Sequence, residues 1–178
     1  MQTDLAEQRF QEIYRQHRRH VLGYFLRRTD AVTARDGASE TFLVAWRRIN
    51  DVPTGEATLP WLYGVSRRVL ANQRRSRDRY VALGRKLSRV GGGEEPSPEV
   101  VVLRRVEDGE ILDAVSKLRP EDQEILRLTV WEELPHAQVA EVVGTSAHAV
   151  TQRLHRITKQ LARDLHRPGR HIGGGDPQ

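Results

Sequence analysis

An apolar stripe near the C-terminal end of the sequence constrains the fold more than any other feature. Four apolar residues recur there at the spacing of one helix face: Val150, Leu154, Ile157 and Leu161. This period predicts an amphipathic helix. Just before it, Gly144 suits a helix end with a positive φ, and Thr145 or Ser146 is suited to cap the next helix. Two short helices joined by such a turn predict a helix-turn-helix, the usual unit for reading the major groove of DNA.

The face of this helix opposite the stripe is polar and basic. The residues expected to contact DNA are Ser146, His148, Thr151, Gln152, Arg153, His155, Arg156 and Lys159. We expect His148, Thr151 and Gln152 to meet base edges, since they lie early on the helix, and the later basic residues to contact phosphates. Three alternatives stay open: an αα-hairpin of an ordinary helical domain, histidines that are only solvated, and Arg153 packed across the edge of the core.

Charge and composition narrow the classes of protein and partner. The 178 residues carry a formal net charge of +5, which favours a polyanionic partner, although the same excess also serves solubility. The absence of cysteine excludes disulfides, thiolate zinc sites and cysteine nucleophiles. The sequence begins without a signal-peptide pattern, and no apolar run reaches the ~20 residues that cross a bilayer. We therefore expect a cytoplasmic protein without membrane insertion.

Helical periodicity without strand-like alternation predicts an all-α fold of two small helical domains joined by a flexible linker. The expected divisions are a first domain at residues 1–80, a linker at 81–108, a helix-turn-helix domain at 109–167 and a disordered tail at 168–178. The linker assignment rests on Gly91–Gly93 followed by Pro96 and Pro98, which forbid a continuous helix.

A second basic helix is expected in the first domain. Pro60 is suited to the first turn of a helix, and it follows a predicted loop at residues 50–59. Arg67, Arg74 and Arg75 lie on the side of that helix opposite its apolar stripe. The arrangement favours nucleic-acid binding over an ordinary solvated run of arginines, because the chain already carries one predicted DNA-reading helix.

Together, these segments resemble the small two-domain sigma factors of bacterial RNA polymerase, known as the extracytoplasmic function group. Glu40–Phe42 and Ala45–Arg47 are similar to the family's helix that docks on the polymerase clamp. Pro60–Tyr63 is similar to the start of the helix that meets the −10 element. Leu118–Leu128, followed by Leu134–Leu154, resembles region four, which reads the −35 element.

The resemblance implies a function and a set of contacts. It implies a sigma factor that directs promoter recognition at the −35 and −10 elements and the melting of DNA, with core RNA polymerase and promoter DNA as partners. The residues implied at the −10 element are Arg67, Arg68, Asn72, Arg74 and Arg75. The residues implied in polymerase binding are Asp36, Glu40 and Arg47. An anti-sigma factor is a further partner that the flexible linker permits.

The sequence departs from the family pattern just before the docking helix. The family usually has Ala-Glu-Asp-Leu-Val-Gln where this chain has Ala34–Ser39. Arg35 stands in place of an acid, and Gly37 costs about 1 kcal/mol relative to alanine inside a helix. Arg68 and Asn72 stand where the family more often has Asn and Asp. These departures bear on polymerase affinity and on −10 preference.

No catalytic residue, metal site or cofactor is expected. The sequence has neither a phosphate-binding glycine loop nor an HExxH motif, and His17 and His20 lack a third ligand. Two other functions remain as alternatives: a free-standing helix-turn-helix repressor or activator, and an interaction protein with a degenerate sigma fold. A repressor is expected to bind a palindromic duplex alone as a dimer, whereas a sigma factor needs core polymerase.

Overall fold

The computed structural model describes residues 2–87, 111 and 113–165, and the secondary structure of these residues is helical. The first block contains α1 (Gln2–Leu26), α2 (Ala31–Arg47), the 3-10 helices η1 (Ile49–Asp51) and η2 (Gly55–Ala57), and α3 (Thr58–Leu87). The second block contains α5 (Pro120–Val130), α6 (His136–Val143) and α7 (Ala147–Leu165). The predicted all-α class is thereby confirmed.

Aromatic side chains fill the space among α1, α2 and α3. Tyr24 and Phe25 of α1 are fully buried, and Tyr63 of α3 is 1% exposed. Phe42 of α2 packs edge-on against Tyr14 of α1, with ring centroids 4.8 Å apart. Each such ring removes on the order of 150–250 Å² from water, so these residues dominate the energetics of the first block.

Asp30 fixes the start of α2. Its carboxylate accepts hydrogen bonds from the hydroxyl of Thr33 (2.7 Å) and from the backbone N–H groups of Thr33 (3.0 Å) and Val32 (3.1 Å). The bonds from Thr33 lower the pKa of Asp30 to about 2. An N-cap of this kind stabilises a helix by about 1 kcal/mol, and it sets which residues of α2 point away from α1.

The apolar side chains of the second block form two groups. Ile125, Leu128, Val139 and Val150 of α5, α6 and α7 are fully buried in a cluster that continues into the first block, whereas Val115, Leu118 and Ile157 form a separate cluster. Helix α5 begins at Pro120 with Glu121 and Asp122 in its first turn, as the sequence predicts. The missing N–H of proline and the two carboxylates both suit the N-terminal end of a helix.

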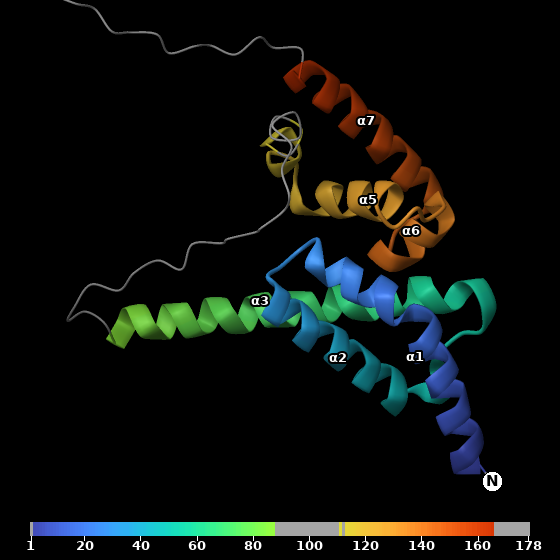
Figure 1. Cartoon of the computed structure of the whole chain (residues 1–178). Helices are drawn as coiled ribbons and strands as arrows, with labels where there is room; N and C mark the ends of the chain where they lie inside the picture. The colour runs from blue at the N-terminus through green and yellow to red at the C-terminus, as the bar shows by residue number, and fades with distance from the viewer. Residues whose placement is uncertain (1, 88–110, 112, 166–178) are drawn as a thin grey trace, which may run out of the picture.

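The two blocks pack directly against each other. Figure 1 shows α5, α6 and α7 stacked on the first block, and α6 is in extensive contact with α3. Val139 and Val142 of α6 belong to the same buried cluster as Leu62 and Val65 of α3. The sequence predicted a flexible connection that lets the blocks separate, whereas in the structure they share one continuous core. The reason is that α6 carries more apolar surface than its own block covers.

Helix α3 continues to Leu87, past the expected end of the first domain at residue 80. The cluster of glycines and prolines begins only at Gly91, and a single Gly84 is tolerated inside a helix. Residues 74–82 are exposed, and this end of α3 extends beyond the body of the molecule (Figure 1). The remainder of the predicted linker and the predicted tail at 168–178 lie outside the described residues.

Candidate nucleic-acid interface

The turn between α6 and α7 has the geometry that the sequence predicts. Gly144 has a φ of 76°, in the left-handed region that favours glycine. The N–H groups of Gly144 and Thr145 both donate to the carbonyl of Ala140, at 2.9 and 3.0 Å. The hydroxyl oxygen of Ser146 accepts from the N–H of Ala149 at 3.1 Å, so Ser146 caps α7. The predicted helix-turn-helix is therefore confirmed.

Helix α7 presents a polar face to solvent. Six of the residues expected on DNA are exposed along it: His148, Thr151, Gln152, His155, Arg156 and Lys159. The opposite face is anchored by Val150 and Ile157, which are 0% and 3% exposed. Because the apolar side is held by the rest of the second block, the polar side remains accessible to a major groove.

Two residues expected on DNA form hydrogen bonds or ion pairs with other residues of the chain. The Thr151 hydroxyl donates to the carbonyl of Ala147 at 3.0 Å and lies 2.9 Å from Nδ1 of His136. Arg153 lies 3.1 Å from the carboxylate of Glu121 and 3.7 Å from that of Asp122. The structure thus favours Arg153 at the edge of the core. Ion pairs of this exposed kind contribute about 0–1 kcal/mol, so DNA is able to compete for the guanidinium.

The residues of α3 expected at the −10 element differ in exposure: Arg67 is half-buried, and Arg68, Asn72, Arg74 and Arg75 are exposed. Asn72 and Arg75 are exposed and hydrogen-bond to each other, and Arg74 donates to the carbonyl of Arg28 at 3.4 Å. Arg67 is half-buried, and it faces the other block.

Two hollows at the junction of the blocks are lined in part by Arg67 and Arg68 of α3. Arg67 lines a hollow of about 190 Å³ together with Glu121 and the turn residue Gly144. Arg68 lines a second hollow, of about 150 Å³, with Trp61 and Glu141. Both hollows therefore combine an arginine of the first block with a carboxylate of the second.

A buried polar cluster joins the two blocks, and nothing in the sequence pattern pointed to it. Arg28 lies at its centre with a side chain that is 0% exposed. Its guanidinium donates to Glu124 at 3.0 and 3.3 Å and to Glu132 at 3.0 Å. Arg27 also donates to Glu132, whose side chain is 1% exposed. Two arginines of the first block thus face two carboxylates of the second.

Two tyrosines complete this cluster. The hydroxyl of Tyr24 donates to Glu124 at 2.8 Å, and that of Tyr63 donates to Glu132 at 3.2 Å. Burial raises the pKa of both phenols, and the carboxylates beside them raise it further, so both remain donors. Burial opposes the charge of Arg28, but Glu124 and its neighbours hold the pKa of Arg28 above its ordinary value.

The residues expected to bind polymerase share the outer face of α2. Asp36, Glu40 and Arg47 are all exposed there. The same helix also exposes Val32 (70%) and Leu43 (46%), and their spacing places them on that face. Apolar side chains between charged ones are typical of a protein-binding surface. Val32 and Leu43 recur at the same helical spacing as the charged residues of this face, and this spacing is the sequence signal that could have located them.

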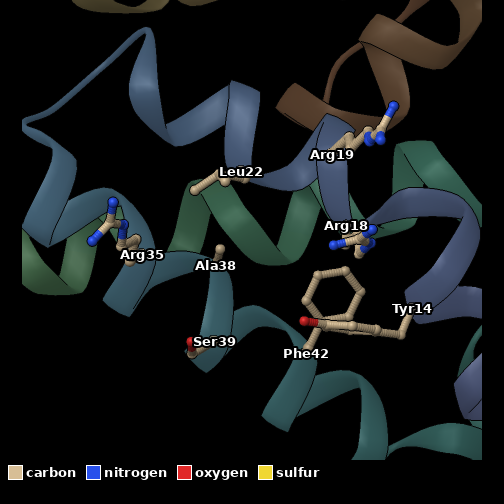
Figure 2. Close-up of a pocket in the computed structure, with 8 residues that line it drawn as sticks. All are labelled: Tyr14, Arg18, Arg19, Leu22, Arg35, Ala38, Ser39 and Phe42. Carbon is tan, nitrogen blue, oxygen red and sulfur yellow. The ribbon is translucent and has the colours of Figure 1, made fainter.

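A basic pocket opens between α1 and α2, next to this face. It has a volume of about 210 Å³, and Figure 2 shows the rings of Tyr14 and Phe42 on one side of it. Arg18, Arg19 and Arg35 are the charged residues among those that line it. Arg35, the residue that departs from the family pattern, therefore adds a third positive charge to this pocket.

A metal site and a membrane span were searched for among the described residues. That part of the chain holds no group of three or more His, Asp or Glu side chains arranged to bind a metal ion. None of its helices is long and apolar enough to span a membrane.

Comparison with known proteins gives matches for both blocks. The model of Sigma-70 region 2 matches residues 13–80, and the model of Sigma-70 region 4 matches residues 108–161. The RNA polymerase sigma factor NccH of Alcaligenes xylosoxydans xylosoxydans is 30% identical over 129 residues, which are 71% of this chain and 69% of NccH. The chain belongs to the sigma-70 family of RNA polymerase sigma factors. The resemblance noted in the sequence is confirmed.

Two further likenesses bear on this sigma factor. The ECF RNA polymerase sigma factor BldN of Streptomyces coelicolor is 34% identical over 160 residues, which are 88% of this chain and 60% of BldN. The sigma factor RpoE of Bartonella quintana, solved in complex with the anti-sigma factor NepR, has the same fold with a TM-score of 0.65 at 16% identity. That likeness covers 90% of this chain and 98% of RpoE. A repressor with only a helix-turn-helix has no need of region 2, so the first block decides against that alternative.

Proposed function

We propose that this sigma factor reads the −35 element with α7 and the −10 element with the loop before α3 and the basic residues of α3. The observation that carries this proposal is the polar face of α7, which follows a well-formed helix-turn-helix and lies open to solvent. A second basic helix in the block that matches region 2 supplies the other reader. Two readers on one chain are what promoter recognition at two separated elements requires.

The roles of the α7 residues divide by position. His148 and Gln152 lie in the first turns after the cap, where recognition helices meet base edges, and they specify sequence. His155, Arg156 and Lys159 lie further along and contact phosphates, which position the protein without reading bases. Thr151 and Arg153 also contact DNA, once DNA displaces the groups of the chain to which these two side chains are bonded.

Gln152→Ala is expected to change the preferred −35 sequence, whereas Lys159→Ala is expected to weaken binding to all sequences alike. Loss of a base contact costs about 1–3 kcal/mol at one position of the site, and loss of a phosphate contact lowers the salt dependence of binding. Transcription by core polymerase from a promoter library, with each position of the −35 element varied, measures both effects. An equal loss on every promoter for the two variants contradicts this division of roles.

Docking on core polymerase is assigned to the outer face of α2. Asp36, Glu40 and Arg47 are the charged residues of this face, and the exposed side chain of Leu43 lies between Glu40 and Arg47. The basic pocket beside it, with Arg35 in its lining, gives this sigma factor a docking surface that is more positive than the family pattern.

The chain acts as a regulatory component rather than as an enzyme, since it lends sequence specificity to a polymerase that carries out the chemistry. It therefore works in the cytoplasm, where promoter DNA and polymerase meet. An anti-sigma factor is a further proposed partner, on the likeness in fold to RpoE, which was solved with one.

A further inference from the structure

We propose that the pocket between α1 and α2 binds a small anion that carries an apolar ring, such as an aromatic carboxylate or an aryl phosphate. The pocket has a volume of about 210 Å³, and three of its eight lining residues are arginines. These lining residues belong to neither of the proposed DNA readers, so the binding itself does not depend on the proposed function. Only the effect of the ligand on polymerase docking rests on that function.

The polar side chains that line this pocket are all able to donate hydrogen bonds, and none of them is a carboxylate. Arg18, Arg19 and Arg35 supply guanidiniums, and Tyr14 and Ser39 supply hydroxyls. None of these five side chains forms an ion pair or a hydrogen bond with another described residue. Five donors without a partner in the described part of the chain favour an anion over a cation or a neutral ligand.

The floor of the pocket is apolar. Ala38 and Phe42 are buried there, Leu22 is half-buried, and the exposed ring of Tyr14 lies edge-on to that of Phe42. Figure 2 shows the two rings on one side of the pocket and Arg35 on the other. A ligand whose ring lies on this floor therefore brings its acidic group to the exposed arginines, since a few polar groups above an apolar surface orient a bound molecule.

The volume of the pocket limits the ligand to about one ring. An apolar cavity of about 150 Å³ is large enough for benzene, whereas sites for drug-sized ligands occupy about 300–1,000 Å³. At about 210 Å³, the pocket admits a single ring with a carboxylate or phosphate, and it is too small to enclose a nucleotide.

A bound anion changes the charge of the neighbouring docking face. Arg35 and Ser39 of the pocket directly precede Asp36 and Glu40 of that face in α2. An anion paired with Arg35 cancels the positive charge that this residue brings to a position where the family pattern has an acid. We therefore expect core polymerase to bind this chain more tightly when the pocket is occupied.

Phenyl phosphate is the probe for the site, and benzyl alcohol and inorganic phosphate supply its ring and its charge separately. Titration of the full chain, followed by the backbone amide NMR signals of α1 and α2, is expected to give the tightest binding for phenyl phosphate. The largest shifts are expected at Ala38 and Ser39. Equal affinities for phenyl phosphate and inorganic phosphate, or shifts confined to residues outside the pocket, overturn the proposal.

A pair of double variants tests the role of the arginines. Arg18→Gln/Arg35→Gln removes two charges of the pocket, and Arg15→Gln/Arg48→Gln makes the same change at two exposed arginines outside it. With helical content confirmed by circular dichroism, the first variant is expected to bind phenyl phosphate between about tenfold and 150-fold more weakly than the second, because it loses hydrogen bonds between charged groups. Equal affinities of the two variants overturn the proposal.

The affinity of the chain for core polymerase, with and without phenyl phosphate, tests the effect on docking. The probe is expected to raise this affinity about twofold to fivefold in the native chain and to leave it unchanged in Arg18→Gln/Arg35→Gln. An unchanged or weaker affinity of the native chain overturns this effect. If the chain binds phenyl phosphate but never binds core polymerase, the proposed function is contradicted while the ligand site is supported.

Discussion

Arg28→Met is expected to lower the free energy of unfolding by about 3–5 kcal/mol. The substitution keeps most of the packing volume, but it leaves the carboxylates of Glu124 and Glu132 buried without the cation that both of them face. Arg27 remains for Glu132 alone. The loss is bounded by the cost of separating the blocks, because separation returns both carboxylates to water.

Urea unfolding followed by circular dichroism measures this loss. Arg48→Met is the matched control, because Arg48 also pairs with a carboxylate, Asp51 at 3.0 Å, but its side chain is 50% exposed. A surface pair of that kind contributes about 0–1 kcal/mol. An equal effect of the two substitutions contradicts the assignment of Arg28 as the centre of a buried cluster.

Gly37→Ala is expected to destabilise the protein by about 1–3 kcal/mol. Helix propensity alone predicts the opposite effect. Alanine favours a helix over glycine by about 1 kcal/mol, so propensity alone predicts stabilisation. A Cβ on Gly37, however, clashes with Cε1 of Phe25 and lies 2.7 Å from Cδ1 and 2.8 Å from Cζ of the same ring. Phe25 is fully buried in a closely packed core, so its ring or the backbone of α1 or α2 must shift to admit the methyl group.

Gly64→Ala provides the control for this prediction. Gly64 also lies inside a helix, α3, but a Cβ there meets no atom within 4 Å. The substitution is expected to stabilise the protein by about 0.5–1 kcal/mol. Thermal unfolding of the two variants measures the difference, and stabilisation by both substitutions contradicts the close contact of Gly37 with Phe25.

Local features of this chain were predictable from the sequence. The helix-turn-helix depends on residues that are close together in the chain: the period of α7, the positive φ of Gly144 and the cap at Ser146. Each of these has a direct physical reason in the residue type, so the sequence pattern and the structure agree. The start of α5 at Pro120 was predictable for the same reason.

Features that depend on distant residues were not predictable. In the sequence, Gly37 only weakens a helix, and its role as the site where Phe25 packs depends on how α1 crosses α2. Arg28 and Glu124 are 96 positions apart, so no periodicity relates them. The apolar face of α6 was visible, but the surface of α3 that covers it was not. Arg67 lines a hollow with Glu121 only because the two blocks pack together, and Arg153 meets Glu121 because α5 packs against α7 within the second block.

Transcription by purified core RNA polymerase, with and without this chain, on a library of genomic fragments tests the proposed function most directly. Initiation at specific sites is expected only when the chain is added. The sequences that these starts share at two fixed distances upstream then identify the −35 and −10 elements. Gln152→Ala is expected to redistribute the starts. If no start depends on the chain, and the chain alone protects a specific palindromic duplex, promoter recognition with polymerase is contradicted and a free-standing regulator is the better description.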